Sequence, residues 1–273
     1  MTTISTRPIE ETKQMRIFFS ECAADYGTYT FPYTCYCELD IGDGDAEMND
    51  ALKRGFLPYT GNWGLGAGFS RQLFYMCRSL RVSTAVFQCS SENRRIQRKA
   101  ADISLESVRP LAEVRELVES AEFEAFCCDY AKERFAGGSM TPARLRFVLS
   151  RRAATHLFTF VREGKAVAYV LANITIDALH YWYSFLDTSL RHESVGIFAM
   201  LSVLLWSKER GLSHVYLGTG YGAKALYKVR NFNAVEWFDG NSWLSDVGEL
   251  KRRIAADGEP LPAGDRFKET CSL

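Results

Sequence analysis

The sequence has no excess charge of either sign, because 33 lysine and arginine residues balance 33 aspartate and glutamate residues over 273 positions. A generally polybasic nucleic-acid binder releases counterions through a surplus of basic side chains, so that class is excluded. Hydrophobic residues make up 47% of the chain and charged residues 24%, which is not a disordered composition. We therefore expect one large folded domain or two modest ones.

Long apolar runs and a secretory leader are also missing. The segment from Met1 to Pro8 lacks the basic stretch and apolar run of a signal peptide. The longest apolar stretch, 195–206, is about two-thirds of the roughly 18 residues that a membrane span needs. We expect a buried helix there, and a cytoplasmic protein that makes no membrane contact.

The eight cysteines are too few and too scattered for a disulfide scaffold, and a cytosolic protein keeps them reduced. Structural zinc usually takes paired Cys-x-x-Cys ligands, whereas this chain has Cys35-x-Cys37 and an isolated Cys77. Buried thiols are the favoured interpretation. Cys35, Cys37 and Cys77 stay as the weaker candidates for a metal site or for contact with an acceptor.

From residue 155 onward, strand and helix signals alternate. Residues 155–161, 166–172 and 179–186 predict an antiparallel meander, with Gly164 in the first turn and Tyr181, Tyr183 and Phe185 on one face of the third strand. A helix should run from 194 to 210 with Ser194 as its N-cap. A strand at 215–217, a glycine-rich loop at 218–222, a helix at 223–230 and a strand at 234–238 follow.

Upstream, the apolar spacing predicts a helix over 114–135 and a second from 141 to 151, with Thr141 as N-cap. The resulting order of elements over 105–240 is typical of a GNAT-type acyltransferase fold, an α+β arrangement of a mixed, mostly antiparallel sheet flanked by helices. We expect a smaller N-terminal α/β region at 1–104, the GNAT-type domain at 105–245 and a tail with a short helix at 246–273.

Charges are segregated along the chain, with acidic residues at 38–50 and basic residues at 94–99 and 224–230. An EF-hand beginning at Asp43 would have Met48 where glycine is required and Arg54 where the last ligand belongs, so calcium binding is rejected. The acidic stretch is better interpreted as a solvated turn that enters a helix at 46–54.

Two glycine-containing motifs suggest anion binding. Gly218-x-Gly220-x-Gly222 leads into a helix, but the lysine after it is displaced from the phosphate-loop pattern, so the segment is either an oxyanion-holding or phosphate-holding loop or a tight turn. Residues 191–196 lie where a GNAT-type fold holds pyrophosphate. The side chain of Ser194, at a position where that fold usually has glycine, disfavours acetyl-CoA. The four histidines are scattered, so no catalytic triad is supported.

The segment 215–232, and Lys224, Tyr227, Lys228 and Phe232 within it, resembles the C-terminal signature of the arginyl-tRNA–protein transferases and the related bacterial leucyl transferases. Residues 183–187 and 194–198 are similar to two further motifs of that family. Weaker likenesses are Cys35, the segment 77–79 and the basic run 94–99. The resemblance spans about residues 26 to 244.

This resemblance implies that an aminoacyl group moves from charged tRNA to an amine on a protein, peptide or small molecule, forming a peptide bond. It implies no cofactor for that reaction, and the cysteine pattern departs from the family's N-terminal metal or iron–sulfur site. Two alternatives stay open: a CoA-dependent N-acyltransferase, and a non-catalytic relative that binds tRNA or peptide.

The implied site has three groups of residues. Tyr183, Tyr227 and Asp187 would act at the reaction centre, by stacking on the terminal base, relaying a proton or orienting the aminoacyl ammonium; packing and turn-capping are their alternative roles. Backbone groups near Ser194, Gly196, Gly218 and Gly220 would hold the oxyanion or the 3′-adenosine. The expected tRNA phosphate contacts are Arg94, Arg95, Arg98, Lys99, Lys224, Lys228 and Arg230.

Overall fold

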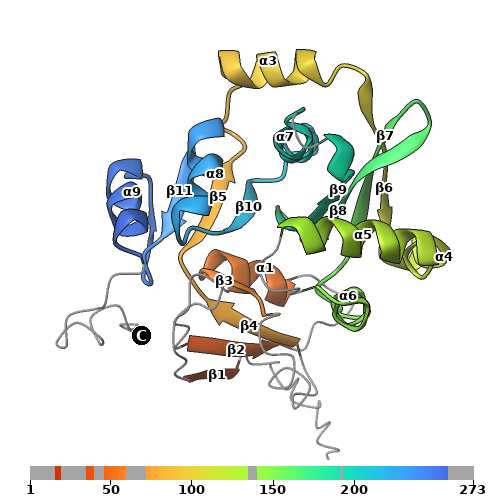
Figure 1. Cartoon of the computed structure of the whole chain (residues 1–273). Coiled ribbons are helices and arrows are strands. Elements are labelled where there is room, and N and C mark those ends of the chain that lie inside the picture. The colour runs from red at the N-terminus through yellow and green to blue at the C-terminus, as the bar shows by residue number, and fades with distance from the viewer. Residues whose placement is uncertain are drawn as a thin grey trace, which may run out of the picture.

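The computed structural model describes residues 16–19, 35–39, 46–59, 72–134, 140–190 and 193–257, and their strands form two sheets (Figure 1). The smaller sheet is antiparallel, and helix α1 (Ala46–Lys53) buries Met48, Ala51 and Leu52 against it. It has the order β1-β2-β4-β3, with β1 Arg16–Phe19, β2 Cys35–Leu39, β3 Phe56–Pro58 and β4 Gln72–Met76. The expected small N-terminal α/β region is present, although residues 40–45 of the acidic stretch lie outside the described residues.

The larger sheet has the order β12-β11-β5-β10-β9-β8-β7-β6. Its pairs are antiparallel except for β9 and β10, which run parallel. Helices separate β6 from β7, β9 from β10 and β10 from β11, so the predicted element order and the GNAT-type α+β fold are confirmed. The strands are β6 Ile103–Pro110, β7 His156–Arg162, β8 Lys165–Ile174, β9 Ala178–Leu186, β10 His214–Thr219, β11 Val235–Phe238 and β12 Trp243–Leu244.

The N-terminal part of the chain contributes one strand to this larger sheet. Strand β5 (Ser79–Ser83) follows β4 closely and pairs with both β10 and β11, and its Leu80 and Val82 are fully buried in the main core. Helix α3 (Ser91–Lys99) then buries Ile96 in the same core. Residues 79–104, which the sequence grouped with the N-terminal region, therefore pack with the larger sheet.

Helices cover both faces of the larger sheet (Figure 1). Helices α5 (Ala121–Arg134) and α6 (Pro142–Leu149) bury Phe123, Cys127 and Leu145 on one face, together with the short segments η1 (Leu111–Val114) and α4 (Arg115–Val118). Helix α7 (Val195–Glu209) is buried on the other face beneath α3, as its apolar surface predicts. None of the helices in the described ranges is both long and apolar enough to span a membrane.

The helix predicted over 114–135 is in fact broken near residue 120. The Ser120 hydroxyl accepts a hydrogen bond from the Phe123 N–H at 3.1 Å, which gives α5 a cap of its own and ends α4 before it. The second predicted cap is confirmed, because the Thr141 hydroxyl accepts from the Arg144 N–H at the start of α6.

The third strand of the meander does not present the three aromatic side chains on one face. In β9, Tyr183 is paired with Leu171 and Tyr181 with Ala172, so Trp182 is an extra residue in a β-bulge. Tyr181 consequently packs in the core beneath α7, whereas Tyr183 and Phe185 pack on the α5 side. The predicted shared face is wrong for Tyr181, because a one-residue bulge moves a side chain to the opposite face.

The chain after β10 forms the left side of the molecule in Figure 1. The turn η4 (Ala223–Ala225) leads directly into α8 (Leu226–Asn231), which buries Val229, and α9 (Val247–Ala256) buries Leu250 and Ile254 in the main core. The short helix expected in the C-terminal tail is therefore α9, and it packs against the larger sheet.

Candidate functional site

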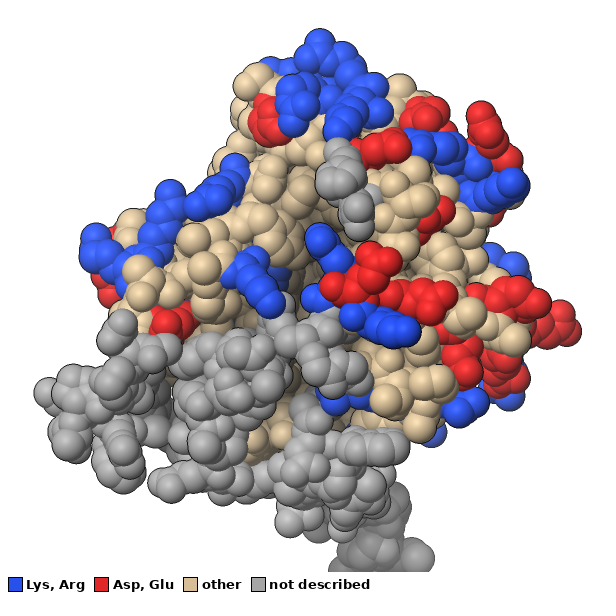
Figure 2. Space-filling view, viewed as in Figure 1, with Lys and Arg blue, Asp and Glu red and all other residues tan. Residues whose placement is uncertain are grey.

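Strands β9 and β10 form a fork at the centre of the larger sheet. Their parallel pairing ends at His180 and Tyr216, after which β9 bulges at Trp182 and stays paired with β8, while β10 is irregular before Gly218 and stays paired with β5. Bulges bend the strand that carries them, so the two strands diverge. Helices α5 and α8 flank this region in Figure 1, and Figure 2 shows the same face hollowed at its centre.

Tyr181 is the first residue of β9 beyond the paired segment, and so it stands at the apex of the fork. Only 5% of its surface is exposed, and its hydroxyl has no hydrogen-bond partner among the described residues. Burial raises the pKa of Tyr181, while the nearby Ser184 hydroxyl lowers it. Tyr227 on α8 and Tyr130 on α5 are near enough to raise this pKa slightly further.

Lys228, expected to contact a tRNA phosphate, points inward from α8. Its Nζ donates a hydrogen bond to the Thr219 carbonyl at 3.0 Å and lies 3.5 Å from where a Cβ on Gly218 would stand. Desolvation lowers the pKa of Lys228 to about 8, and the neighbouring Cys77 raises it. Lys228 therefore ties α8 to the end of β10, and its contact with a tRNA phosphate stays a prediction.

The buried groups around Lys228 are neutral. Burial lowers the pKa of His180 to about 3, with the charge of Lys228 acting in the same direction, and its Nδ1 lies 3.0 Å from the Asn173 amide nitrogen. Burial also raises the pKa of the Cys77 thiol. Neither side chain is therefore ionised near neutral pH, and Lys228 is the cation of this interior group.

The glycine-rich loop is held by the protein itself. The Gly220 N–H donates to the Arg78 carbonyl at 2.7 Å, and the Gly222 N–H donates to the Asp257 carboxylate at 2.7 Å. Arg78 also forms an ion pair with Asp257 at 3.0 Å, in which the two side chains are 10% and 5% exposed, and its guanidinium lies over the Tyr221 ring. These two N–H groups have internal partners, so the tight-turn interpretation describes this part of the loop.

Gly220 and Gly218 are required for other reasons. A Cβ on Gly220 would lie 2.8 Å from the Leu80 side chain, and Gly218 has a φ of +82° at the irregularity in β10. Both glycines therefore shape the strand end beside the fork. A role in holding an oxyanion at Gly218 stays a prediction.

The turn before α7 brings Ser194 and Gly196 to the edge of the fork. Ser194 is the N-cap residue, but its side chain makes no capping hydrogen bond and its φ is +62°, a left-handed conformation that favours glycine. A Cβ on Gly196 would lie 3.1 Å from the Leu186 side chain of β9. Glu193, beside Ser194, pairs with Arg162, so a carboxylate stands next to the helix N-terminus.

Tyr183 and Asp187 have contacts within the protein, and their roles at the reaction centre stay predictions. Tyr183 stacks on Phe185 with ring centroids 6.1 Å apart on the α5 side of the sheet. The Asp187 carboxylate accepts hydrogen bonds from the N–H and hydroxyl of Ser189, which is the turn-capping role considered as its alternative. Tyr227 on α8 is 40% exposed and lies near enough to Tyr181 to influence its pKa.

The two basic segments, which are far apart in the sequence, adjoin in the structure. The Asn93 side-chain amide of α3 donates to the Asn231 carbonyl at the end of α8 at 2.8 Å, and the Phe87 and Phe232 rings are 6.3 Å apart. We call the exposed cations of these segments the basic surface, and those of α3 lie along the top of Figure 2. It consists of Arg94, Arg95, Arg98, Lys99, Lys224 and Arg230.

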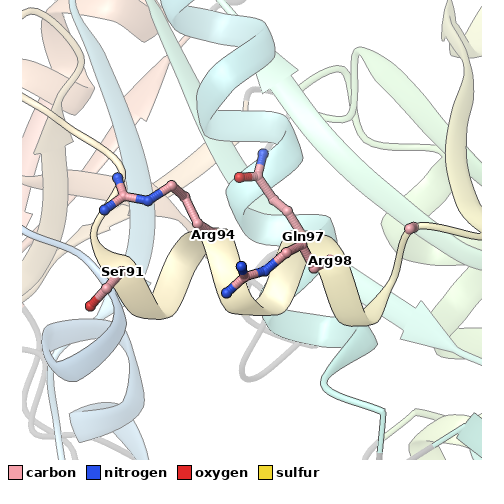
Figure 3. Close-up of a pocket in the computed structure, with 5 residues that line it drawn as sticks. Ser91, Arg94, Gln97 and Arg98 are labelled. Carbon is pink, nitrogen blue, oxygen red and sulfur yellow. The ribbon is translucent and has the colours of Figure 1, made fainter.

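Part of the basic surface is a shallow pocket of about 450 Å³ along α3, lined by Ser91, Arg94, Gln97, Arg98 and Ala101 (Figure 3). Arg94 and Arg98 are one helical turn apart there. The opposite side of the hollow in Figure 2 is predominantly acidic. Helices α4 and α5 supply this acidity through Glu116, Glu122, Glu124, Asp129 and Glu133.

The candidate cysteines do not share one location. Cys35 and Cys37 are buried in the cluster beneath α1, whereas Cys77 packs in a separate cluster with Tyr36 and Tyr216. Within the described ranges, no group of three or more histidine, cysteine, aspartate or glutamate side chains is arranged to hold a metal ion. The buried-thiol interpretation agrees with this placement, and burial raises the pKa of Cys37.

Residues 115–230 match the family model described as "Arginine-tRNA-protein transferase, C terminus". Over this segment the chain is similar to that family. The chain is 27% identical to an aspartate/glutamate leucyltransferase of Rhizorhabdus wittichii over 81% of its own length and 85% of the relative's. It is 24% identical to the aspartate/glutamate leucyltransferase of Brucella suis over 74% of its length and 84% of that relative.

The solved structures are less similar in sequence to this chain than these two relatives are. L-PGS from Bacillus licheniformis is 12% identical with a TM-score of 0.41, over 63% of this chain and 49% of that one. A GCN5-related N-acetyltransferase from Kribbella flavida is 16% identical with a TM-score of 0.34, over 58% and 54%. The identification of the fold depends on the order and pairing of its own strands.

Two residues of the site have no signal in the sequence. Tyr181 looks like any aromatic residue of a strand, and Asp257, which pairs with Arg78 from 179 positions away, has no motif around it. The β-bulge at Trp182 brings Tyr181 to the fork, and the folding of α9 against the larger sheet brings Asp257 to the glycine-rich loop.

Proposed function

We propose that this protein transfers an aminoacyl group from aminoacyl-tRNA to an amine on a protein, forming a peptide bond. The observation that carries the proposal is the family match over residues 115–230, which contain the fork, the turn before α7 and helix α8. The amino acid is leucine-like or arginine-like. We infer that the reaction takes place in the cytoplasm and needs no membrane.

The chemistry requires little beyond positioning. The acceptor amine attacks the ester carbonyl, the new C–N bond forms, and the ester C–O bond to the tRNA ribose breaks. The amine loses a proton and the ribose oxygen gains one. Because the ester is already activated, no ATP or redox cofactor is needed, and the protein must orient the amine and stabilise the oxyanion.

The basic surface fits the tRNA. Its exposed cations on α3, in the η4 turn and on α8 lie on either side of the Asn93–Asn231 contact, which joins α3 to the end of α8. Cations spaced along a surface in this way contact successive phosphates. Tyr227, which is partly exposed beside the fork, is placed to stack on the terminal base.

The acceptor would enter from the acidic side formed by α4 and α5. The α-amino group of a polypeptide is cationic until it is deprotonated, so this side attracts it electrostatically. An acidic surface would repel an acceptor whose first residues are acidic. We therefore propose an acceptor whose N-terminal region is not acidic.

The test is a donor panel. The protein is incubated with each radiolabelled aminoacyl-tRNA and a mixture of acceptor peptides, and in parallel with labelled acetyl-CoA. We expect acid-precipitable label from one or a few aminoacyl-tRNAs and none from acetyl-CoA. Transfer from acetyl-CoA alone would instead establish a CoA-dependent acyltransferase. Absence of transfer from every donor, with tRNA binding retained, would establish a binding protein.

A further inference from the structure

Two buried phenols on neighbouring strands have hydroxyls without a hydrogen-bond partner among the described residues. They belong to Tyr181 on β9 and Tyr216 on β10. Leaving a buried hydroxyl unpaired costs about 1–3 kcal/mol, so a fold retains one only with a reason. The two differ in surroundings: Tyr216 packs under the smaller sheet with Tyr36 and Leu73, whereas Tyr181 lies at the apex of the fork.

The bulge at Trp182 is what directs Tyr181 to this place. Without the extra residue, Tyr181 would share a face with Tyr183 and Phe185 and would pack towards α5. Instead it shares a face with Ala172 in the core beneath α7. The same bulge separates β9 from β10, so one irregularity both opens the fork and places a hydroxyl donor in it.

Among the described residues, no charged side chain hydrogen-bonds to this hydroxyl. The groups that influence its ionisation are Ser184, Tyr227 and Tyr130, all of them neutral near neutral pH. A neutral phenol in a site of low polarity donates a strong hydrogen bond to a developing negative charge, because water does not screen it. Tyr227, 40% exposed, marks the side from which a substrate reaches the fork.

We propose that the Tyr181 hydroxyl is a catalytic hydrogen-bond donor to the carbonyl oxygen of the aminoacyl ester. This rests on the proposed function. As the amine adds to the carbonyl carbon, the oxygen takes up negative charge and accepts the hydrogen bond. The carbonyl then re-forms and the ribose oxygen leaves, taking up the proton that the amine has lost. The phenol keeps its own proton in every step.

The experiment compares Tyr181→Phe with the matched control Tyr216→Phe, each of which removes one unpartnered buried hydroxyl. For Tyr181→Phe we expect kcat for aminoacyl transfer to fall by about 100-fold with KM little changed, the magnitude for losing one oxyanion donor. Its melting temperature should not fall, because the lost hydroxyl had no partner. Tyr216→Phe should keep the wild-type kcat.

A kcat of Tyr181→Phe within about threefold of wild type would overturn the proposal, as would an equal loss in both variants. If the wild type transfers nothing, the proposed function fails, and a second measurement decides about Tyr181. The ¹³Cζ tyrosine resonance of Tyr181, assigned with the variant, is followed during titration with leucyl and arginyl 3′-amide analogues of the charged terminal adenosine. A shift confined to Tyr181 and Tyr227 supports the donor role; no shift overturns it.

Discussion

Ser194 holds a backbone conformation that its side chain opposes. Its φ of +62° is in the left-handed region, where an L-residue other than glycine is disfavoured by about 1–2 kcal/mol. The sequence identified this position as the start of a helix, and the structure confirms it. The backbone strain was not predictable, because the residue type normally favours capping, and here the hydroxyl does not cap.

Replacing Ser194 with glycine should therefore stabilise the protein. We expect Ser194→Gly to raise the free energy of unfolding by about 0.5–1 kcal/mol, since relief of the backbone strain exceeds the added entropy of the unfolded chain. Urea denaturation measures the free energy of unfolding, and Ser194→Val is the control for which a decrease is expected. The β-branched valine should destabilise, and a Ser194→Gly variant less stable than wild type would contradict the backbone account.

The depressed pKa of Lys228 predicts a pH-dependent stability. The unfolded chain binds a proton with the ordinary lysine pKa near 10.4, whereas the folded protein releases it near pH 8, so the unfolded state holds more protons between these values. The stability of wild type relative to Lys228→Met should therefore rise as the pH increases from about 8 to about 10. Urea unfolding of both proteins across this range checks it, and parallel pH curves would show that Lys228 is not desolvated.

At the scale of elements, periodicity and caps predicted most of the C-terminal fold. The predicted Gly164 turn has φ values of +50° at Glu163 and +74° at Gly164, and α7 ends before Gly211, which has a φ of +72°. The exceptions are non-local. The β9 bulge depends on the paired strand β8, and the insertion of β5 between β10 and β11 depends on pairing with segments more than 130 residues away.

The ion pair of Arg78 and Asp257 should be a major support of the loop at 220–222. It is almost fully buried and joins the end of α9, the start of β5 and the Gly222 N–H. Removing one partner of a buried pair costs about 3–5 kcal/mol, because the other charge is left uncompensated. We expect Asp257→Ala to lose about that much stability by denaturant unfolding.

The matched control is the exposed pair of Arg95 and Glu92, one turn apart on α3. Surface pairs are worth little, so Glu92→Ala should change stability by less than about 0.5 kcal/mol. Equal effects of the two substitutions would mean that the Arg78–Asp257 pair is not the support described here.

At the scale of the whole molecule, the zero net charge is a sum of separated regions. The sequence predicted two basic segments but gave no indication that they adjoin, which depends on the Asn93–Asn231 hydrogen bond between α3 and α8. It placed Lys228 among the exposed cations, and folding turned it inward. Residue type predicted the charge of the surface, and only the packing of α8 decided which cations belong to it.

The basic surface predicts salt-dependent tRNA binding. Arg98→Glu and Arg230→Glu should each weaken binding and reduce the slope of log affinity against log salt by about one per lost phosphate contact. Lys165→Glu, in the β7–β8 hairpin, is the control with the same charge change and should bind like wild type. Filter binding from about 50 to 200 mM salt measures this. Equal losses in all three variants would indicate a general charge effect in place of a defined surface.

Intact mass measurement of an acceptor protein after incubation with aminoacyl-tRNA tests the central claim most directly. The account predicts that the acceptor gains the mass of one amino-acid residue, that the product resists mild alkali that cleaves esters, and that ribonuclease pretreatment of the donor abolishes the gain. An acceptor of unchanged mass with every aminoacyl-tRNA, or one that gains only an acetyl group from acetyl-CoA, would contradict it.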